Sequence, residues 1–567
     1  MKNNNSKKKI LIVTAFPTHG AGSGALITTQ AKSYIEEGHE VTIITGNNRT
    51  NFDKLEGVKY HVVPFTAETP DPEKIDGQCP FNYLMFTTHT ESTANFWNVN
   101  LEQVETYMKA FEKAIDEEVK TFNPDIIHTQ HNWLSSSLAT KFEKPIALTI
   151  HGTDLMGYKK AGEKLDETLK KIEQVKQNAD PQTAKNIQII EDVYKKYTSK
   201  QKVLQDLKKA IDEEKLVITK SELSVLVDLF DHKIIYELYK YHAENSAKKS
   251  NQIIVISDDQ ENEFNKLFPG NESKVVLLEN GYDPKTFYVD KDVKKEEVLP
   301  EDKQDYDNLV LFVGKFADFK GIDALLDAAK IYETDAKKNG KVTQTIIVGS
   351  GALDEKLRVQ AQMLGLEHTH FVGRKNHQEI CKLQNLADVS LIPSRNEPFG
   401  LVVIEGTSCG HPVIATNSGG IPGILNIKKE DLSDKTKSYQ TKLGVLVPPL
   451  PERPESLNDI EKDKLDELTT KYMMAPDEEK LLINNQIAKD LKLDEQDVQN
   501  YINQFALTVN GISDAVIKIA EKEITFDNQE IADYTRENYG QDVIREKILK
   551  IFDNAIIDYK NNQKEQR

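Results

Sequence analysis

The chain has 567 residues and a mass of 64.3 kDa, more than one compact core usually holds, so several domains are expected. Hydrophobic residues make up 38% and charged residues 29%, a globular composition that excludes collagenous, low-complexity and wholly disordered chains. The formal net charge of −18, from 73 basic and 91 acidic residues, argues against a nucleic-acid partner, and no membrane contact is indicated.

The first 150 residues alternate apolar, strand-like segments with amphipathic, helix-like ones. Strands are expected at residues 9–15, 40–45, 58–65, 125–130 and 145–150, and helices at 24–37 and 101–122. Alternation of this kind predicts a parallel sheet covered by helices.

The same alternation resumes at residue 308. Strands are expected at residues 309–313, 343–348, 369–372, 388–392 and 412–416, and helices at 322–332, 353–364, 377–386 and from 400 onward. Two separate runs predict an α/β protein with two Rossmann-like domains that face each other across a cleft.

Two segments interrupt this pattern. Residues 163–269 contain no glycine, and apolar residues recur at helical spacing from 163 to about 245, which predicts a long antiparallel helical insertion. Internal packing as a hairpin is the favoured interpretation, and a surface for a homo-oligomer or an extended acceptor is the alternative. Residues 451–505 are acidic after a proline-rich opening and predict a second, mostly helical insertion.

These elements predict a division into domains. We expect an N-terminal domain, a hydrated linker, a C-terminal domain and terminal helices that pack back on the N-terminal domain, at residues 1–285, 286–307, 308–530 and 531–567.

Cysteine content and hydropathy bear on the cell compartment. Cys79, Cys381 and Cys409 are too widely spaced for a disulfide framework or a CxxC metal motif. No apolar run reaches the ~18 residues that cross a bilayer, and the run at 10–16 is interpreted as a buried strand rather than a signal peptide. A cytoplasmic location is therefore expected.

The most informative stretch is residues 394–405, Ser-Arg-Asn-Glu-Pro-Phe-Gly-Leu-Val-Val-Ile-Glu. A strand ends before it and a helix begins near Gly400, so free backbone N–H groups should lie at the carboxyl edge of a parallel sheet, where phosphates bind. Glu397 precedes the helix and Glu405 lies within it. An isolated pair at this spacing is more often a loop carboxylate and a solvated helix residue.

Neighbouring loops favour a binding site. Lys315 and Lys320 follow the first strand of the same domain, so both ammonium groups can meet a diphosphate and offset leaving-group charge without a metal. Alone, two loop lysines would usually be solvated surface. Further turns on that edge are Gly349-Ser350-Gly351, Phe371 to Arg374, and Ser418-Gly419-Gly420.

This order of motifs resembles the retaining nucleotide-sugar glycosyltransferases of the GT-B fold, glycosyltransferase family four, which includes bacterial mannosyltransferases and sucrose-phosphate-synthase-like enzymes. The likeness covers residues 309–424 and 443–448 and the terminal helix. In the first domain it covers the glycine loop at 17–24 and the motifs at 38–41, 124–128 and 151–154. The family commonly has arginine where Lys315 stands, and lysine loses the bidentate fork.

The resemblance implies a role for each matching residue. Lys315 and Lys320 would hold the donor diphosphate, and Glu405 the ribose hydroxyls. Glu397 would hold the transferred sugar and β-phosphate together with the backbone of Phe399, Gly400 and Leu401. His151 would lie beside the reacting carbon. Gly22 and Gly24 would approach the phosphates, and Phe371 and Arg374 would lie by the nucleobase.

The activity implied is metal-independent, retaining transfer from a nucleoside-diphosphate sugar to a sugar, glycan, lipid or protein acceptor, with no resident cofactor. UDP is the expected carrier by family frequency, with GDP and ADP as alternatives. The first domain would bind the acceptor, whose identity the sequence leaves open.

Three other interpretations stay open. A Rossmann oxidoreductase would use Gly349-Ser350-Gly351, although the third glycine and the acidic partner of that fingerprint are missing. A glycoside hydrolase would use Glu397 and Glu405 but would not need the lysine pair. A non-catalytic protein that binds sugar nucleotides or partners would be expected to lose some of the five charged or histidine site residues, and all are present. The DxD sequences at 290–292 and 305–307 are attributed to chance in an Asp-rich segment.

Overall fold

The computed structural model describes residues 7–18, 23–49, 52–66, 79, 84, 86, 94–196, 199–432, 434–454 and 456–565. The chain forms two compact units. Unit 1 comprises Met1–Ile256, Glu261–Leu278 and Arg545–Arg567, and unit 2 comprises Ser257–Gln260 and Glu279–Ile544. No helix among the described residues combines the length and the apolar character that a bilayer crossing requires.

Unit 1 is built on a seven-stranded, wholly parallel sheet in the order β3-β2-β1-β4-β5-β6-β7. The strands are β1 (Lys9–Thr14), β2 (Glu40–Asn47), β3 (Val58–Pro64), β4 (Ile126–Gln130), β5 (Ile146–Thr149), β6 (Gln252–Val255) and β7 (Val275–Leu277). Residues Ile10 to Val13 have no exposed surface, as expected of a central parallel strand with both faces covered. The strand order reverses between β1 and β4, which makes the carboxyl ends of these strands the switch point where ligands bind in such sheets.

Helices cover this sheet. They are α1 (Ser23–Glu36), α2 (Leu101–Thr121), α3 (Leu134–Ala139), α8 (Asp258–Leu267) and, from residue 545, α18 (Gln541–Glu565). The returning helix is packed into the unit, because the Phe552 ring lies 5.9 Å from that of Tyr34 and 5.1 Å from that of His128.

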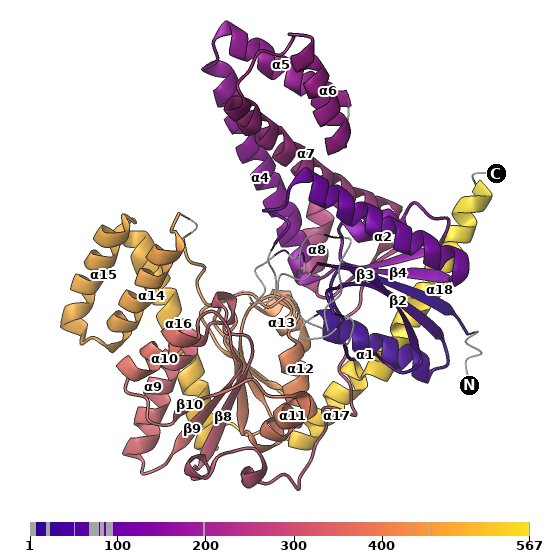
Figure 1. Cartoon of the computed structure of the whole chain (residues 1–567). Coiled ribbons are helices and arrows are strands. Elements are labelled where there is room, and N and C mark those ends of the chain that lie inside the picture. The colour runs from indigo at the N-terminus through magenta and orange to yellow at the C-terminus, as the bar shows by residue number, and fades with distance from the viewer. Residues whose placement is uncertain are drawn as a thin grey trace. The chain divides into compact units, whose positions relative to one another are not determined.

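The first insertion is a helical projection from unit 1. It comprises α4 (Gly152–Gln177), α5 (Pro181–Lys196), α6 (Lys200–Asp212) and α7 (Lys220–Lys249). Figure 1 shows α4 and α7 running side by side, with α5 and α6 at their far ends. The far end has its own apolar core, which includes Ile172, Ile190, Val203, Leu207, Leu226 and Phe230. The helical insertion predicted from the sequence is present and packs against itself, with α4 and α7 as the expected pair and α5 and α6 added at their far ends.

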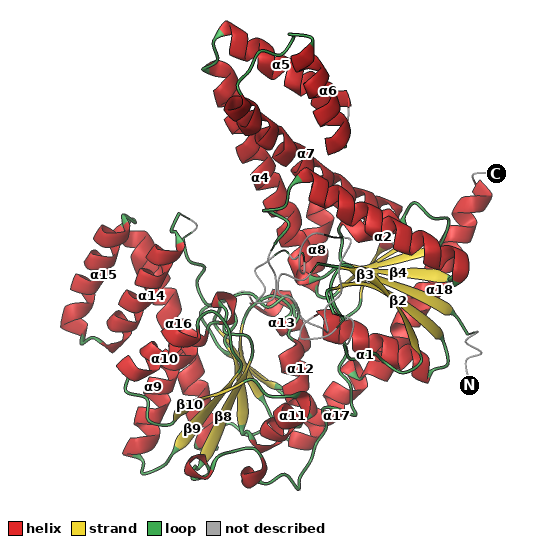
Figure 2. Ribbon diagram, viewed as in Figure 1, coloured by secondary structure: helices red, strands yellow, loops and turns green. Residues whose placement is uncertain are grey.

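Unit 2 repeats the architecture with the order β10-β9-β8-β11-β12-β14-β13, parallel except for the edge pair β13–β14. The strands are β8 (Asn308–Val313), β9 (Thr343–Val348), β10 (Thr369–Gly373), β11 (Val389–Ile392), β12 (Val413–Thr416), β13 (Tyr439–Thr441) and β14 (Gly444–Val447). The helices of this unit are α9 (Ile322–Lys338), α10 (Asp354–Met363), α11 (His377–Leu386), α12 (Leu401–Ser408), α13 (Ile421–Ile424), α16 (Glu495–Ala520) and α17 (Asn528–Tyr539). In Figure 2 each sheet is a twisted fan of strands with helices packed against it.

The second insertion adds α14 (Asp459–Met474) and α15 (Asp477–Leu491) to the amino-terminal part of α16. These helices share a small core that includes Leu457, Leu465, Ile487 and Ile502. Farther along α16, Phe505, Val509 and Ile512 join the main core of unit 2, so one helix serves both the insertion and the sheet.

Two boundaries differ from those expected. Residues 286–307 belong to unit 2 rather than forming a hydrated linker, because the Asp290 N–H donates to the Asn385 side chain at 2.7 Å and the Gln344 amide donates to the Lys303 carbonyl at 2.7 Å. The returning segment of unit 1 begins at residue 545 rather than 531, because α17 packs on α12 in unit 2.

Candidate functional site

The switch point of the unit 2 sheet lies between β8 and β11, whose carboxyl-end loops carry the predicted lysines and Glu397. The loops are joined through their backbones, since the Phe319 carbonyl accepts from the Arg395 N–H at 2.8 Å. Gly321 makes this approach sterically feasible: its φ is +63°, and a Cβ there would lie 1.9 Å from the Pro393 carbonyl oxygen. The sequence-predicted loops therefore meet where an α/β sheet binds ligands.

Lys320 and Glu397 form the centre of this site. The Lys320 Nζ lies 2.5 Å from Glu397 Oε2, and the Ser394 hydroxyl donates to the same oxygen at 3.1 Å. Both side chains are largely shielded, with 18% of Lys320 and 11% of Glu397 exposed. The pair places a cation and a hydrogen-bond acceptor side by side in a site of reduced solvent screening.

Glu405 lies in the second turn of α12. Burial raises the pKa of this carboxyl to about 7, and the Lys320 ammonium opposes the rise. Carboxyls with a perturbed pKa occur often at binding sites, where a ligand's donors select the charged form.

The helix α12 begins at Gly400, whose φ is +113°. The first N–H groups of a helix have no acceptor within it, so those of Leu401 and Val402 supply donors and the positive end of the helix dipole. The turn before the helix is fixed by a backbone hydrogen bond, in which the Gly420 N–H donates to the Glu397 carbonyl at 3.0 Å. Phe399 is 3% exposed, and its ring packs against that of Tyr539 with 6.3 Å between centroids.

Phe371 lies in β10 and Arg374 directly after it, beside the loop that follows β9. The Arg374 Nε donates to the Ser350 hydroxyl at 2.6 Å, and the Phe371 ring meets Phe316 edge to face at 5.8 Å between centroids. The Arg358 guanidinium covers the Phe371 ring at 4.8 Å. Lys315, on the adjoining β8 loop, is exposed and forms no ion pair with any described side chain.

In unit 1, His151 follows β5 and caps the amino terminus of α4. It is 6% exposed, and its Nε2 lies 2.8 Å from the Gln130 amide oxygen at the end of β4. Burial, followed by the neighbouring His131 and His128, holds the pKa of His151 well below its usual value. The imidazole is therefore neutral at pH 7, with its Nε2–H donating to Gln130.

Sequence reasoning missed His131 and the role of Asp154. The Asp154 carboxylate accepts from His131 Nδ1 at 2.8 Å, from the Asn132 N–H at 3.0 Å and from the His151 N–H at 2.8 Å. The His131 ring stacks on that of His151 with 4.3 Å between centroids. The signal was present in the sequence, since a buried strand followed by Gln-His-Asn puts polar side chains at a sheet's carboxyl edge.

The glycine loop of unit 1 is described in part. Gly22 lies outside the described residues. Gly24 opens α1, and a Cβ there would lie 2.6 Å from the Pro17 carbonyl oxygen, so the residue is required for close packing of helix on loop. Of the two DxD sequences, 305–307 precedes β8 at the amino edge of the sheet, away from the switch-point loops.

The chain is a two-unit α/β protein with polar and charged side chains at the switch point of the unit 2 sheet, and part of it is similar to known proteins. Residues 293–438 match the family described as Glycosyl transferases group 1, and this range contains every unit 2 site residue predicted above.

Individual proteins similar to this chain are also described as glycosyltransferases. The chain is 34% identical over 186 residues to an uncharacterized glycosyltransferase from Methanocaldococcus jannaschii, covering 32% of this chain and 46% of the relative. It is 30% identical over 210 residues to a D-inositol 3-phosphate glycosyltransferase from Jonesia denitrificans, covering 36% of this chain and 49% of the relative. The matched part of the chain thus spans about half the length of these relatives.

A solved structure gives the fold over the whole chain. Sucrose-phosphate synthase from Thermosynechococcus elongatus superposes with a TM-score of 0.51 at 15% identity, covering 97% of this chain and all of that protein. At this identity the likeness shows the GT-B fold alone, and it confirms the fold class predicted from the sequence.

Proposed function

We propose that the protein transfers a sugar from a nucleoside-diphosphate sugar, with UDP the expected nucleotide, to an acceptor, retaining the anomeric configuration and needing no metal ion. The observation that carries this proposal is the Lys320–Glu397 pair at 2.5 Å, at the switch point and beside the free end of α12. The ammonium and the backbone N–H groups match the negative charges of a diphosphate, and the two carboxyls match the hydroxyls of the ribose and the transferred sugar.

Each group has a distinct task in this proposal. The β-phosphate gains negative charge as its bond to the anomeric carbon breaks, and Lys320, Lys315 and the α12 N–H groups stabilise that charge. Glu397 accepts hydroxyls of the transferred sugar, and Glu405 accepts those of the ribose. Because Lys320 is already paired with Glu397, the phosphate joins an existing ion pair.

His151 contributes from unit 1. Its neutral imidazole adds no positive charge that would oppose an oxocarbenium-like centre on the sugar. Its position is set by two contacts, the hydrogen bond to Gln130 and the backbone bond to Asp154. We assign it to orienting the sugar, with the acceptor expected on the unit 1 side.

A donor screen tests the proposal. Purified protein is mixed with UDP-, GDP- and ADP-sugars in EDTA, and hydrolysis or transfer is followed by NMR of the released sugar. We expect one donor to react with its anomeric configuration kept. An inverted product, or activity that EDTA abolishes and Mn²⁺ restores, contradicts the mechanism. Binding of the nucleotide without any turnover would favour a non-catalytic sugar-nucleotide-binding protein.

A further inference from the structure

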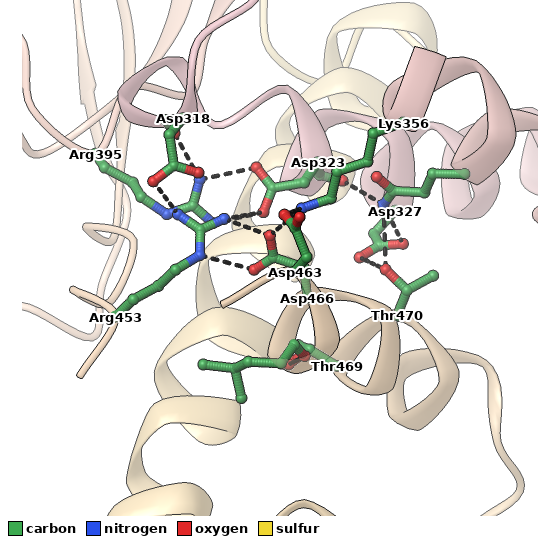
Figure 3. Close-up of polar contacts among 12 residues, drawn as sticks. Asp318, Asp323, Asp327, Lys356, Arg395, Arg453, Asp463, Asp466, Thr469 and Thr470 are labelled. Carbon is green, nitrogen blue, oxygen red and sulfur yellow. Dashed lines mark hydrogen bonds and ion pairs between the residues drawn. The ribbon is translucent and has the colours of Figure 1, made fainter. Parts of the chain in front are cut away.

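Arg453 is a buried cation that the proposed reaction does not use. It lies between β14 and α14, at the start of the second insertion, and only 4% of its side chain is exposed. Its Nε and Nη2 donate to the two oxygens of Asp466 in α14 at 2.7 and 2.8 Å. Its Nη1 donates to Asp318 Oδ2 at 2.8 Å, so one guanidinium joins the insertion to the β8 loop (Figure 3).

Asp318 opens the 3₁₀ turn η4 (Asp318–Lys320), and the Lys320 of that turn carries the proposed phosphate contact. The turn is also held from the β11 loop, because Arg395 Nη1 donates to the Asp318 carbonyl at 3.1 Å. The Nη1 and Nη2 groups of Arg395 also donate to the two carboxylate oxygens of Asp323 at 2.8 and 2.5 Å. Arg453 Nη2 lies 3.5 Å from the same Asp323 carboxylate. The two guanidinium groups thus hold the turn from two sides.

The cluster separates into an inner and an outer part. Asp323 and Asp466 are 12% and 7% exposed. Although burial alone would raise the pKa of Asp323, Arg395 and Arg453 together hold it well below its usual value. On the outer side, Asp318 is 58% exposed, and Asp463, which contacts Lys356, is 62% exposed. An outer carboxylate can therefore be altered without uncovering a buried charge.

We propose that Arg453 is a positioning residue: through its hydrogen bond to Asp318 it fixes the turn 318–320, and with it the place of Lys320 at the donor phosphate. The second insertion is then part of the donor site rather than an appendage, because Asp466 of α14 orients the Arg453 guanidinium. This inference rests on the proposed function, since it assumes that Lys320 binds a phosphate.

The direction in which ligand affinity changes in one variant distinguishes positioning of the turn from a purely electrostatic effect. Replacing Asp318 with Asn removes a negative charge two residues from Lys320 and weakens the hydrogen bond to Arg453. If only charge mattered, an anionic ligand would bind more tightly to the variant. If the hydrogen bond positions the turn, the ligand binds more weakly. Asp463→Asn is the matched control, because it removes an equally exposed carboxylate from the same cluster on the side facing Lys356.

The experiment compares the wild type, Asp318→Asn, Asp318→Glu and Asp463→Asn by amide hydrogen exchange without ligand and by calorimetric titration with UDP, GDP and ADP. In Asp318→Asn we expect residues 315–321 to exchange at least about fivefold faster and the preferred nucleotide to bind about tenfold more weakly, with unchanged thermal unfolding. Asp318→Glu should restore much of the slow exchange and much of the nucleotide affinity. In Asp463→Asn both the exchange rate and the affinity should stay within about twofold of the wild type.

Three results would overturn the inference: exchange of the turn no faster than in the Asp463→Asn control, tighter nucleotide binding by Asp318→Asn, or equal effects of the two Asn variants. If the wild type binds none of the three nucleotides, the proposed function fails. The exchange comparison still decides whether the Arg453–Asp318 contact holds the turn.

Discussion

Asp327 provides a test of the electrostatics inside unit 2. This residue of α9 is 3% exposed, and its carboxyl accepts hydrogen bonds from the Thr470 hydroxyl at 3.2 Å and the Gln360 amide at 3.4 Å. Burial, reinforced by the Asp323 charge, raises its pKa from 3.8 to about 8. The carboxyl is therefore protonated at pH 7, and we predict that Asp327→Asn, which mimics this neutral form, removes a pH dependence of stability.

The sign follows from proton linkage. Because the folded-state pKa lies above the unfolded value, protonation favours the folded state, and this stability is fully present below about pH 4 and lost as the pH rises through 8. One such group changes the free energy of unfolding by about 1.4 kcal/mol per pH unit. Between pH 5 and pH 8 the wild type should therefore lose roughly 3 to 4 kcal/mol relative to Asp327→Asn.

Urea unfolding at both pH values, followed by circular dichroism, measures this difference. Both tryptophans, Trp97 and Trp133, lie in unit 1, so their fluorescence reports a transition that the substitution should leave unchanged. Asp335→Asn, at a less buried position two turns along α9, serves as the control and should keep the wild-type slope. Equal pH slopes for the wild type and Asp327→Asn would refute the reasoning.

Three further predictions concern the candidate site. Lys320→Ala should lower kcat/KM for donor turnover by about 10²- to 10³-fold and weaken nucleoside-diphosphate binding, whereas an unchanged kcat/KM would place the phosphate elsewhere. Ribose hydroxyls favour ionised Glu405, whose pKa is about 7, so nucleotide affinity should fall by up to tenfold per pH unit below pH 7. Glu405→Gln should keep only the weaker pH dependence that comes from protonation of the ligand's own phosphate at about pH 6. His151→Ala should lower kcat by about 10²-fold with nucleotide affinity within about twofold of wild type; a large loss of affinity would contradict its assignment to the sugar.

Much of the fold and part of the site could be predicted from local sequence. A run such as Leu309 to Val313 is a buried parallel strand, and the residues directly after it lie at the carboxyl edge. Lys320 and Glu397 are 77 residues apart, yet each follows such a strand, so strand position alone brought them together. Residues placed by family likeness, such as Phe371 and Arg374, could be located but their ligands could not.

The contacts that local sequence could not predict join segments with no shared pattern. Arg453 and Asp318 are 135 residues apart, and no sequence motif at either position predicts that they are in contact. Likewise, the His131 side chain is hydrogen-bonded to Asp154 in the first turn of α4, and the φ of His131 is +74°. The hydrated linker predicted at 286–307 was wrong because the charge of this segment indicates hydration, whereas its hydrogen bonds to Asn385 and Gln344 join it to distant parts of unit 2.

The first insertion is anchored at the candidate site, which determines how its role can be tested. α4 begins beside His151, and the carboxyl-terminal half of α7 carries core residues of unit 1, among them Tyr239 and Ala243. The hydroxyl of Ser246 in α7 also donates to the Asn132 side chain. Removing all of residues 163–245 would therefore unfold unit 1 and reveal nothing about the projecting end.

A shorter deletion avoids this damage. The Tyr158 hydroxyl donates to Glu244 at 2.7 Å, and Lys240 lies 4.2 Å above the Tyr158 ring, which sets the register of α4 against α7. Continuing that register outward brings Lys170 level with His232, so a short Gly/Ser turn can replace residues 171–231 and remove the separate far-end core as a whole. We expect the variant to fold, with nucleotide affinity within about twofold of wild type, because the unit 2 site is untouched. Loss of the unit 1 fold, seen as unfolded tryptophan fluorescence, would show that the far end is structurally required. If the variant hydrolyses donor but no longer transfers to the acceptor of the intact protein, the far end holds that acceptor.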